Sequence, residues 1–149
     1  MSQTYIGSTL RTGSDTLTDS TDGGFVVVSQ TTTVTTASAG TATSATLTLP
    51  AQSQIIDILV DMVQDEVVGG GTATQIAMTV GTTAAGTQYV SSTNIFAGGR
   101  AALTFTAAQL AAMANIGSNQ SVVITVDPNG TISTTQAIVR LTVVYAQKV

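Results

Sequence analysis

The sequence predicts an all-β fold: an antiparallel, jelly-roll-like β-sandwich of about eight strands, with one short connecting helix and an N-terminal arm. Three observations predict it. β-branched residues recur in short runs, turns of small residues separate these runs, and a convincing helical pattern occurs only once. This pattern favours an antiparallel sandwich over a parallel α/β sheet. An immunoglobulin-like topology is the alternative, but the chain has no Trp and no Cys pair to support it.

We divide the chain into an arm, residues 1–24, and a sandwich domain, residues 25–149. The arm segment is polar and has neither a helical period nor a sustained period of two. Its few apolar residues cannot build a core of their own, so an arm that occupies a neighbouring subunit and a disordered tail both fit the pattern. These apolar residues are Tyr5, Ile6, Leu10 and Leu17.

The expected strands follow one another from Phe25 onward. Pro50 ends the second, and glycine clusters at 69–71 and 98–99 separate later ones. The composition of residues 127–130, Asp-Pro-Asn-Gly, indicates a turn before the last strand. The apolar and β-branched runs cover residues 25–36, 44–50, 54–63, 72–80, 88–92, 100–106, 121–127 and 137–146.

The strand expected at 54–63 has two distinct faces, because successive side chains alternate across a strand. The face predicted to join the core carries Ile56, Ile58, Val60 and Met62. The other face, predicted to be mostly solvated, carries Asp57, Leu59, Asp61 and Val63. Leu59 and Val63 are apolar on this wet face, so we expect them and the four apolar residues of the arm to form a subunit interface.

The one expected helix lies between Thr106 and Gly117. Gln109 follows Thr106 by three residues, which is the spacing of a capping box at a helix N-terminus. We expect Leu110 and Met113 to lie on the buried face of this helix.

The composition argues against most enzyme classes. The 149 residues include no His and no Cys, so the chain has no imidazole base, thiolate nucleophile or soft metal ligand. Four Lys and Arg against eight Asp and Glu give a net charge of −4, which does not suit a nucleic-acid partner. Charged residues make up only 8%, so the surface must consist mainly of hydroxyl and amide groups. We expect no enzymatic activity and no cofactor.

The acidic residues Asp57, Asp61, Asp65 and Glu66 are a candidate cation site, because carboxylate oxygens are the ligands that Ca²⁺ prefers. Residues four apart in a strand are separated by about 13 Å, which is too far for one ion held by this strand alone. We therefore expect no metal site. The same aspartates interrupt the most hydrophobic stretch, so no membrane span is expected. The first residues lack the features of a signal peptide, which predicts synthesis in the cytoplasm.

Residues 48–145 resemble a family of small β-sandwich virion proteins from tailed bacteriophages and gene transfer agents, known as capsid decoration or head structural proteins. None of the resembling segments is a catalytic signature, and no functional residue can be transferred, because decoration proteins act through surfaces. The helix at 106–115 is more extensive than in this family. The resembling segments are LTLPAQSQIIDILVDM, TQIAMTVGTTAAGTQYVSST, FAGGRAAL and IVRLTVVYA.

This resemblance implies a non-enzymatic decoration or cement protein on the capsid surface of the virion, made in the host cytoplasm. Its partner would be the major capsid protein, and a homotrimer would suit the three-fold sites of a capsid. The alternative is a head or tail fibre or spike domain that recognises host surface glycan. A glycan-binding domain should expose aromatic side chains, and three Tyr, three Phe and no Trp are few for that role.

Overall fold

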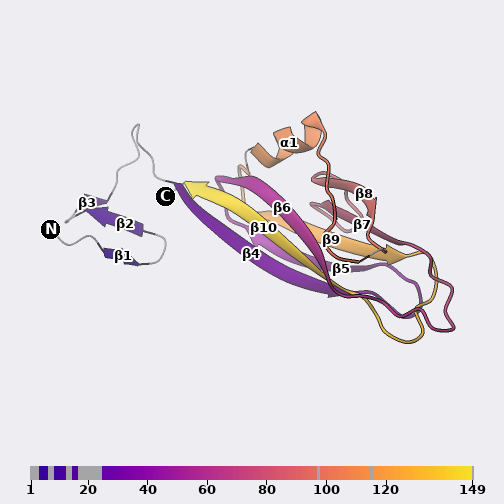
Figure 1. Ribbon diagram of the computed structural model, residues 1–149. Coiled ribbons are helices and arrows are strands. Elements are labelled where there is room, and N and C mark those ends of the chain that lie inside the picture. Colours follow the sequence, from indigo (N-terminus) through magenta and orange to yellow (C-terminus); the bar gives the residue numbers. More distant parts are fainter. Residues whose placement is uncertain are drawn as a thin grey trace.

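The computed structural model describes residues 4–6, 9–12, 15–16, 25–96, 98–114 and 116–148. From Phe25 onward the chain forms two antiparallel sheets that pack face to face, which confirms the predicted sandwich (Figure 1). One sheet has three strands in the order β4-β10-β6, and the other has four in the order β5-β9-β7-β8. The strands are β4 (Phe25–Thr35), β5 (Thr43–Leu49), β6 (Ser53–Gln64), β7 (Ile76–Gly81), β8 (Val90–Asn94), β9 (Gln120–Pro128) and β10 (Ile138–Lys148).

The strand order is that of a jelly roll. The last strand, β10, lies between β4 and β6 and not beside β9, as the last two strands of an immunoglobulin sheet would. Most connections therefore cross from one sheet to the other. The β7–β8 hairpin stays within its sheet, whereas the chain from β8 to β9 passes the edge of β6 before it returns to the four-stranded sheet.

Residues 99–101 take the place of an eighth strand beside β6. The Met62 amide donates to the Gly99 carbonyl (2.8 Å), and the Ala101 amide donates to the Val60 carbonyl (2.9 Å). The run expected as a strand at 100–106 thus pairs only over its first residues. Beyond them, Leu103 and Phe105 are half-buried against the core.

A β-bulge in β6 corrects the predicted core face of this strand. β10 pairs Val144 with Asp57 and then Tyr145 with Ile55, so Ile56 is an extra residue with no partner. Because of this extra residue, Ile55 is buried (3% exposed) whereas Ile56 is 52% exposed. The prediction for Ile56 was wrong, whereas Ile58, Val60 and Met62 are buried as expected.

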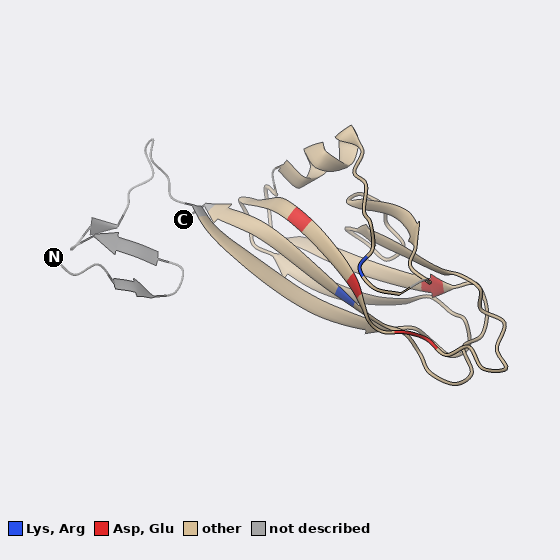
Figure 2. Ribbon diagram, in the orientation of Figure 1, with Lys and Arg blue, Asp and Glu red and all other residues tan. Residues whose placement is uncertain are grey.

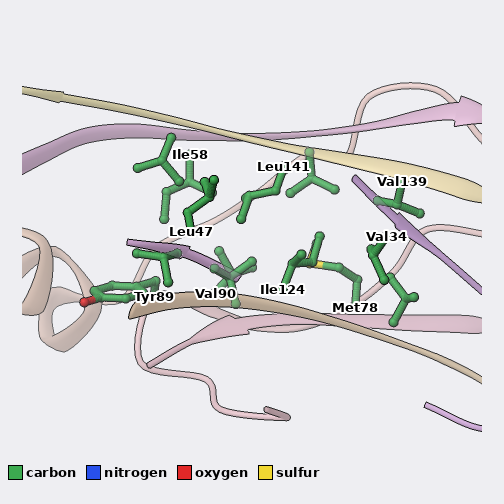
Figure 3. Close-up of a cluster of buried hydrophobic side chains, with 14 of the residues drawn as sticks. Val34, Leu47, Ile58, Met78, Tyr89, Val90, Ile124, Val139 and Leu141 are labelled. Carbon is green, nitrogen blue, oxygen red and sulfur yellow. The ribbon is translucent and has the colours of Figure 1, made fainter. Parts of the chain in front are cut away.

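The core lies between the two sheets. Figure 3 shows side chains from the three-stranded sheet pointing toward those of the four-stranded sheet. Such interdigitation removes apolar surface from water, and each fully buried Leu, Ile or Val contributes about 1.5–3 kcal/mol to stability. The largest fully buried side chains include Leu49, Ile58, Ile76, Met78, Ile124 and Leu141.

The helix α1 (Ala107–Ala114) begins with the predicted capping box. The Gln109 amide donates to Thr106 Oγ1 (3.3 Å), and Gln109 Oε1 accepts from the Thr106 amide (2.8 Å). Gln109 Nε2 also donates to the Thr87 carbonyl and to Ser91 Oγ, which draws this polar side chain inward. Gln109 and Met113 are therefore the buried residues of α1. Leu110, one residue or about 100° further round the helix, is 52% exposed, which corrects its predicted burial.

The β4–β5, β6–β7 and β9–β10 connections meet at the end of the sandwich away from α1. Side-chain hydrogen bonds and close glycine contacts hold them together. Asn129 Oδ1 accepts from the amides of Thr74 (2.8 Å) and Gln75 (2.9 Å). Gly40, at φ +73°, lies so close to Gly130 that a Cβ would meet its carbonyl oxygen at 2.6 Å. β9 continues through Pro128, so the predicted turn begins two residues late. Proline is tolerated there because its nitrogen faces the β5 side, where the pairing of β9 with β5 has already ended at Val126.

The predicted arm contains three short strands, β1 (Thr4–Ile6), β2 (Thr9–Thr12) and β3 (Asp15–Thr16). They pair with one another as a separate antiparallel sheet in the order β1-β2-β3. The division into arm and sandwich stays a prediction, because residues 17–24, which would join the two, lie outside the described residues.

Candidate functional site

The predicted interface residues fall in two parts of the chain. Leu59 is half-buried and Val63 is 55% exposed, both on the face of β6 that points away from the core. Tyr5 on β1 and Leu10 on β2 are paired across their strands, and Ile6 pairs with Thr9. Leu17 lies outside the described residues.

Leu59 lies in a broader surface, the outer face of the three-stranded sheet. The strand register places Thr142 between Thr31 of β4 and Leu59 of β6, and the Thr31 and Thr142 hydroxyls are 3.1 Å apart. The next row along the sheet consists of Ser29, Val144 and Asp57. Rows of this composition present hydroxyl and apolar side chains side by side. The outer face comprises Val27, Ser29, Thr31, Thr33, Gln54, Asp57, Leu59, Asp61, Ile138, Arg140, Thr142, Val144 and Ala146, with Arg100 at its margin.

Asp61, on the edge strand β6, binds two arginines of this face. Asp61 Oδ1 accepts from Arg100 Nε at 2.8 Å, and its Oδ2 accepts from Arg140 Nη2 at 3.3 Å. The Arg100 hydrogen bond, more than the one from Arg140, holds the pKa of Asp61 below its ordinary value of 3.8. Figure 2 shows how sparse charge is elsewhere in the sandwich. Two arginines balance Asp57 and Asp61, so the outer face is electrically neutral by count.

The acidic residues do not form a cation site among the described residues. No group of three or more Asp or Glu side chains there is placed to hold a metal ion. Asp57 Oδ1 accepts from the following amide, that of Ile58, at 2.8 Å. Burial, followed by the neighbouring charge of Asp65, raises the pKa of Glu66. Asp57 and Asp61 thus bond to neighbouring groups, whereas Glu66 Oε2 is buried without a hydrogen-bond partner among the described residues.

The outer face of the four-stranded sheet is partly covered by its own chain. The loop after β7 folds back so that the Ala85 amide donates to Thr125 Oγ1 (2.8 Å), and Ser44 Oγ lies 2.8 Å from the same hydroxyl. Thr125 is only 4% exposed as a result. The three-stranded sheet therefore has the more accessible strand surface at its centre.

The sequence analysis missed several residues of the outer face. Arg140, Thr142 and Val144 could have been found, because their alternation along the last strand predicts a common face. Arg100 could not, since its contact with Asp61 arises only when the chain from β8 crosses to the edge of β6.

The helix of the described residues is eight residues long, and no helix there is long and apolar enough to cross a membrane. Comparisons of the chain with protein-family models, with curated proteins and with solved structures found no match.

Proposed function

We propose that this protein is a non-enzymatic structural protein of a bacteriophage virion, which binds the assembled capsid as a decoration or cement protein and stabilises the shell. The observation that supports this proposal is the outer face of the three-stranded sheet, a continuous surface of hydroxyl and apolar groups with balanced charges. Such a surface suits attachment to another protein that depends little on ionic strength. The partner we propose is the major capsid protein, with this chain as a homotrimer on the capsid surface after synthesis in the host cytoplasm.

The stabilising effect would follow from mass action. A protein that binds the assembled lattice but not free coat subunits stabilises the lattice by RT ln(1 + [L]/Kd) at each site. Even about 1 kcal/mol per contact becomes large when it is summed over many coat subunits. This mechanism requires neither a metal ion nor a buried ion pair.

The alternative, recognition of host glycan by a fibre or spike domain, has less support from the described side chains. Tyr89 and Tyr145 are buried, at 2% and 3% exposed. Phe96 and Phe105 are half-buried against the core. No aromatic side chain among the four described is fully exposed as a stacking platform for a sugar.

The proposal can be tested with heads assembled without this protein. We expect the purified protein to co-sediment with expanded heads but not with free coat protein, and to remain bound in high salt and in EDTA. Mass spectrometry of complete particles should count hundreds of copies. Particles without it should release their genome at a lower temperature or under milder osmotic shock. Equal resistance with and without the protein, or a dozen copies per particle, would exclude cementing, and release by EDTA would indicate a calcium site instead.

Two variants test the proposed surface. Leu59→Asp and Thr142→Lys introduce charge in the centre of the outer face and should abolish co-sedimentation with heads. Thr46→Lys is the matched control, because Thr46 is exposed on the outer face of the other sheet. Circular dichroism should show that all three proteins are folded. Normal binding by both outer-face variants would mean that another surface meets the capsid.

A further inference from the structure

The sandwich has two lateral sides, and they differ in whether another segment of the chain covers the sheet edge. On the β6 side, formed by the edge strands β6 and β8, residues 99–101 pair with one end of β6, and Ile116 pairs with Ser53 at its other end. On the β4 side, formed by the edge strands β4 and β5, the Thr43 hydroxyl donates to the Thr35 carbonyl (2.7 Å). Beyond this bond, β4 extends further than the seven-residue β5, because it has eleven residues.

The hydrogen-bonding direction of each β4 residue follows from the register. The Thr36 amide donates to the Ala137 carbonyl (3.0 Å), and the pairing of β4 with β10 continues this register without a shift. Backbone groups of successive residues point to opposite sides of an antiparallel strand. The even-numbered residues therefore bond to β10, and every second residue from Phe25 to Thr33 directs its backbone groups away from the sheet. Within the described part of the chain, these outward amides have no backbone partner.

β4 lacks the features that usually protect such an edge. Its sequence, FVVVSQTTTVT, contains no charged residue and no proline, and its register with β10 has no bulge. Long, uncharged, regular edges readily pair with another strand. On the same side, Val28 and Ala45 pack against the core but are only partly buried. A strand added to β4 would cover this apolar surface.

We propose that β4 pairs with β4 of a second copy of this chain, antiparallel and about a two-fold axis at Ser29. Ser29 is the midpoint of the free backbone groups between Phe25 and Thr33, so this register alone satisfies all of them. Ser29 would face Ser29 of the partner subunit, and Val27 would face Thr31 of the partner subunit. No like charges meet, and Val–Thr is a favourable β-branched cross-strand pair. The result is a continuous six-stranded sheet.

The self-complementary register is the reason to choose a second copy over a strand of another protein. With a two-fold axis at Ser29, the part of β4 before Ser29 in one copy pairs with the part after Ser29 in the other copy. All residues of this edge are uncharged. This contact uses the β4 edge and not Leu59 or Val63, so it is compatible with a separate contact through the outer face. It is a two-fold contact of the free protein, distinct from the homotrimer proposed on the capsid, and it does not depend on the proposed capsid role.

The chain contains no cysteine, which allows a single introduced thiol to report the register. In the proposed dimer the two Ser29 Cα atoms are about 5.5 Å apart, within the range of a disulfide. Ser29→Cys should therefore form a covalent dimer on oxidation with diamide. Thr33→Cys is the control, because Thr33 is also an exposed hydroxyl residue of β4, but its copy would be about 27 Å away. We expect the Ser29→Cys dimer to form at least about tenfold faster.

Two further measurements use no cysteine. Sedimentation velocity of the wild type should show a concentration-dependent dimerisation step, which Ser29→Lys abolishes by placing like charges opposite each other and Thr46→Lys leaves intact. Amide hydrogen exchange at Val27, Ser29 and Thr31 should slow as the protein concentration rises. Equal cross-linking of both cysteine variants, or the absence of self-association with no Ser29→Cys dimer, would overturn the proposal and leave this edge to another protein. If the protein failed to bind capsids, the proposed pairing through β4 would not be affected.

Discussion

The β6 side and the β4 side of the sandwich solve the problem of a free sheet edge in different ways. On the β6 side, Gly99 and Ala101 bond to the edge of β6, and Ile116 bonds to its first residue, Ser53. Residues 99–105 form the covering segment of this edge, and its inward side chains, Leu103 and Phe105, extend the core. On the β4 side, the described chain supplies no such segment, and a regular, uncharged edge is left. The comparison indicates that the chain covers the edge of β6 with its own residues, and that the edge of β4 is suited to pairing with a strand of another chain.

The largest expected effect tests how the β6 side is built. Ile55→Ala removes a buried side chain beside the bulge and should lower the free energy of unfolding by about 2–5 kcal/mol. Ile56→Ala, at the neighbouring and exposed position, should change it by less than about 0.5 kcal/mol. Urea denaturation of the two variants measures the difference. Similar losses in both would mean that the bulge is not where the structure places it.

The next effect tests the hydrogen-bonding direction of β4. Thr32→Pro removes an amide that bonds to β10, and should cost about 2–4 kcal/mol of stability. Thr33→Pro removes an amide that points away from the sheet, and should cost less than about 1 kcal/mol. Thermal unfolding of dilute protein separates the two. A larger loss for Thr33→Pro would reverse the assignment on which the open edge depends.

A third effect concerns the helix that closes the β6 side. Gln109→Ala removes the capping interaction and the bonds to Thr87 and Ser91, and should lower stability by about 2 kcal/mol. Leu110→Ala is the control on the same helix and should cost less than about 1 kcal/mol, because Leu110 is largely exposed.

Hydrogen exchange should localise the effect of Gln109→Ala. We expect faster exchange of the Met62 and Ala101 amides, which join β6 to its covering segment. The Val34 amide, on the opposite side of the sheet, should be unaffected. Uniformly faster exchange would instead mean that α1 stabilises the whole sandwich and not one side of it.

These contrasts also explain what the sequence could predict. The strands and the sandwich follow from local composition, and the capping box at Thr106 and Gln109 was visible as a spacing. The bulge could not be predicted, because Ile55 and Ile56 are the same residue type and only the register with β10 decides which one is buried. Leu110 was assigned to the core by polarity alone, whereas the hydrogen-bond partners of Gln109 lie about 20 residues away in sequence, in and beside β8.

The candidate surface was only partly predictable for a similar reason. Leu59 was identified because it is an apolar residue on an acidic face of one strand. Its neighbours in space come from β4 and β10, which are distant in the chain. The open edge of β4 depends on the order of strands in the sheet, which the composition of β4 does not contain. Both the outer face and the open edge of β4 depend on pairing between distant parts of the chain, so the sequence alone could not predict them fully.

The smallest expected effect concerns the two ion pairs of Asp61, one with Arg100 in the covering segment and one with Arg140 on β10. Asp61→Asn removes the acceptor that Arg100 and Arg140 share, and should lower stability slightly, because exposed ion pairs contribute little. Asp127→Asn is the control, since Asp127 is also a strand aspartate but is exposed and forms no ion pair among the described residues. Thermal unfolding at low ionic strength measures both, and added salt should reduce the effect of Asp61→Asn.

The pH dependence of this last effect identifies its cause. Because the pKa of Asp61 is lowered from 3.8 in the folded protein, the unfolded chain binds its proton first as the pH falls. The stability contributed by Asp61 is therefore complete well above that value and is lost as the pH falls through the still lower pKa of the folded state. The difference between wild type and Asp61→Asn should be present near neutral pH and shrink in strong acid. A difference that persists unchanged at low pH would show that Asp61 acts through packing, and that the β6 side is held by its backbone bonds alone.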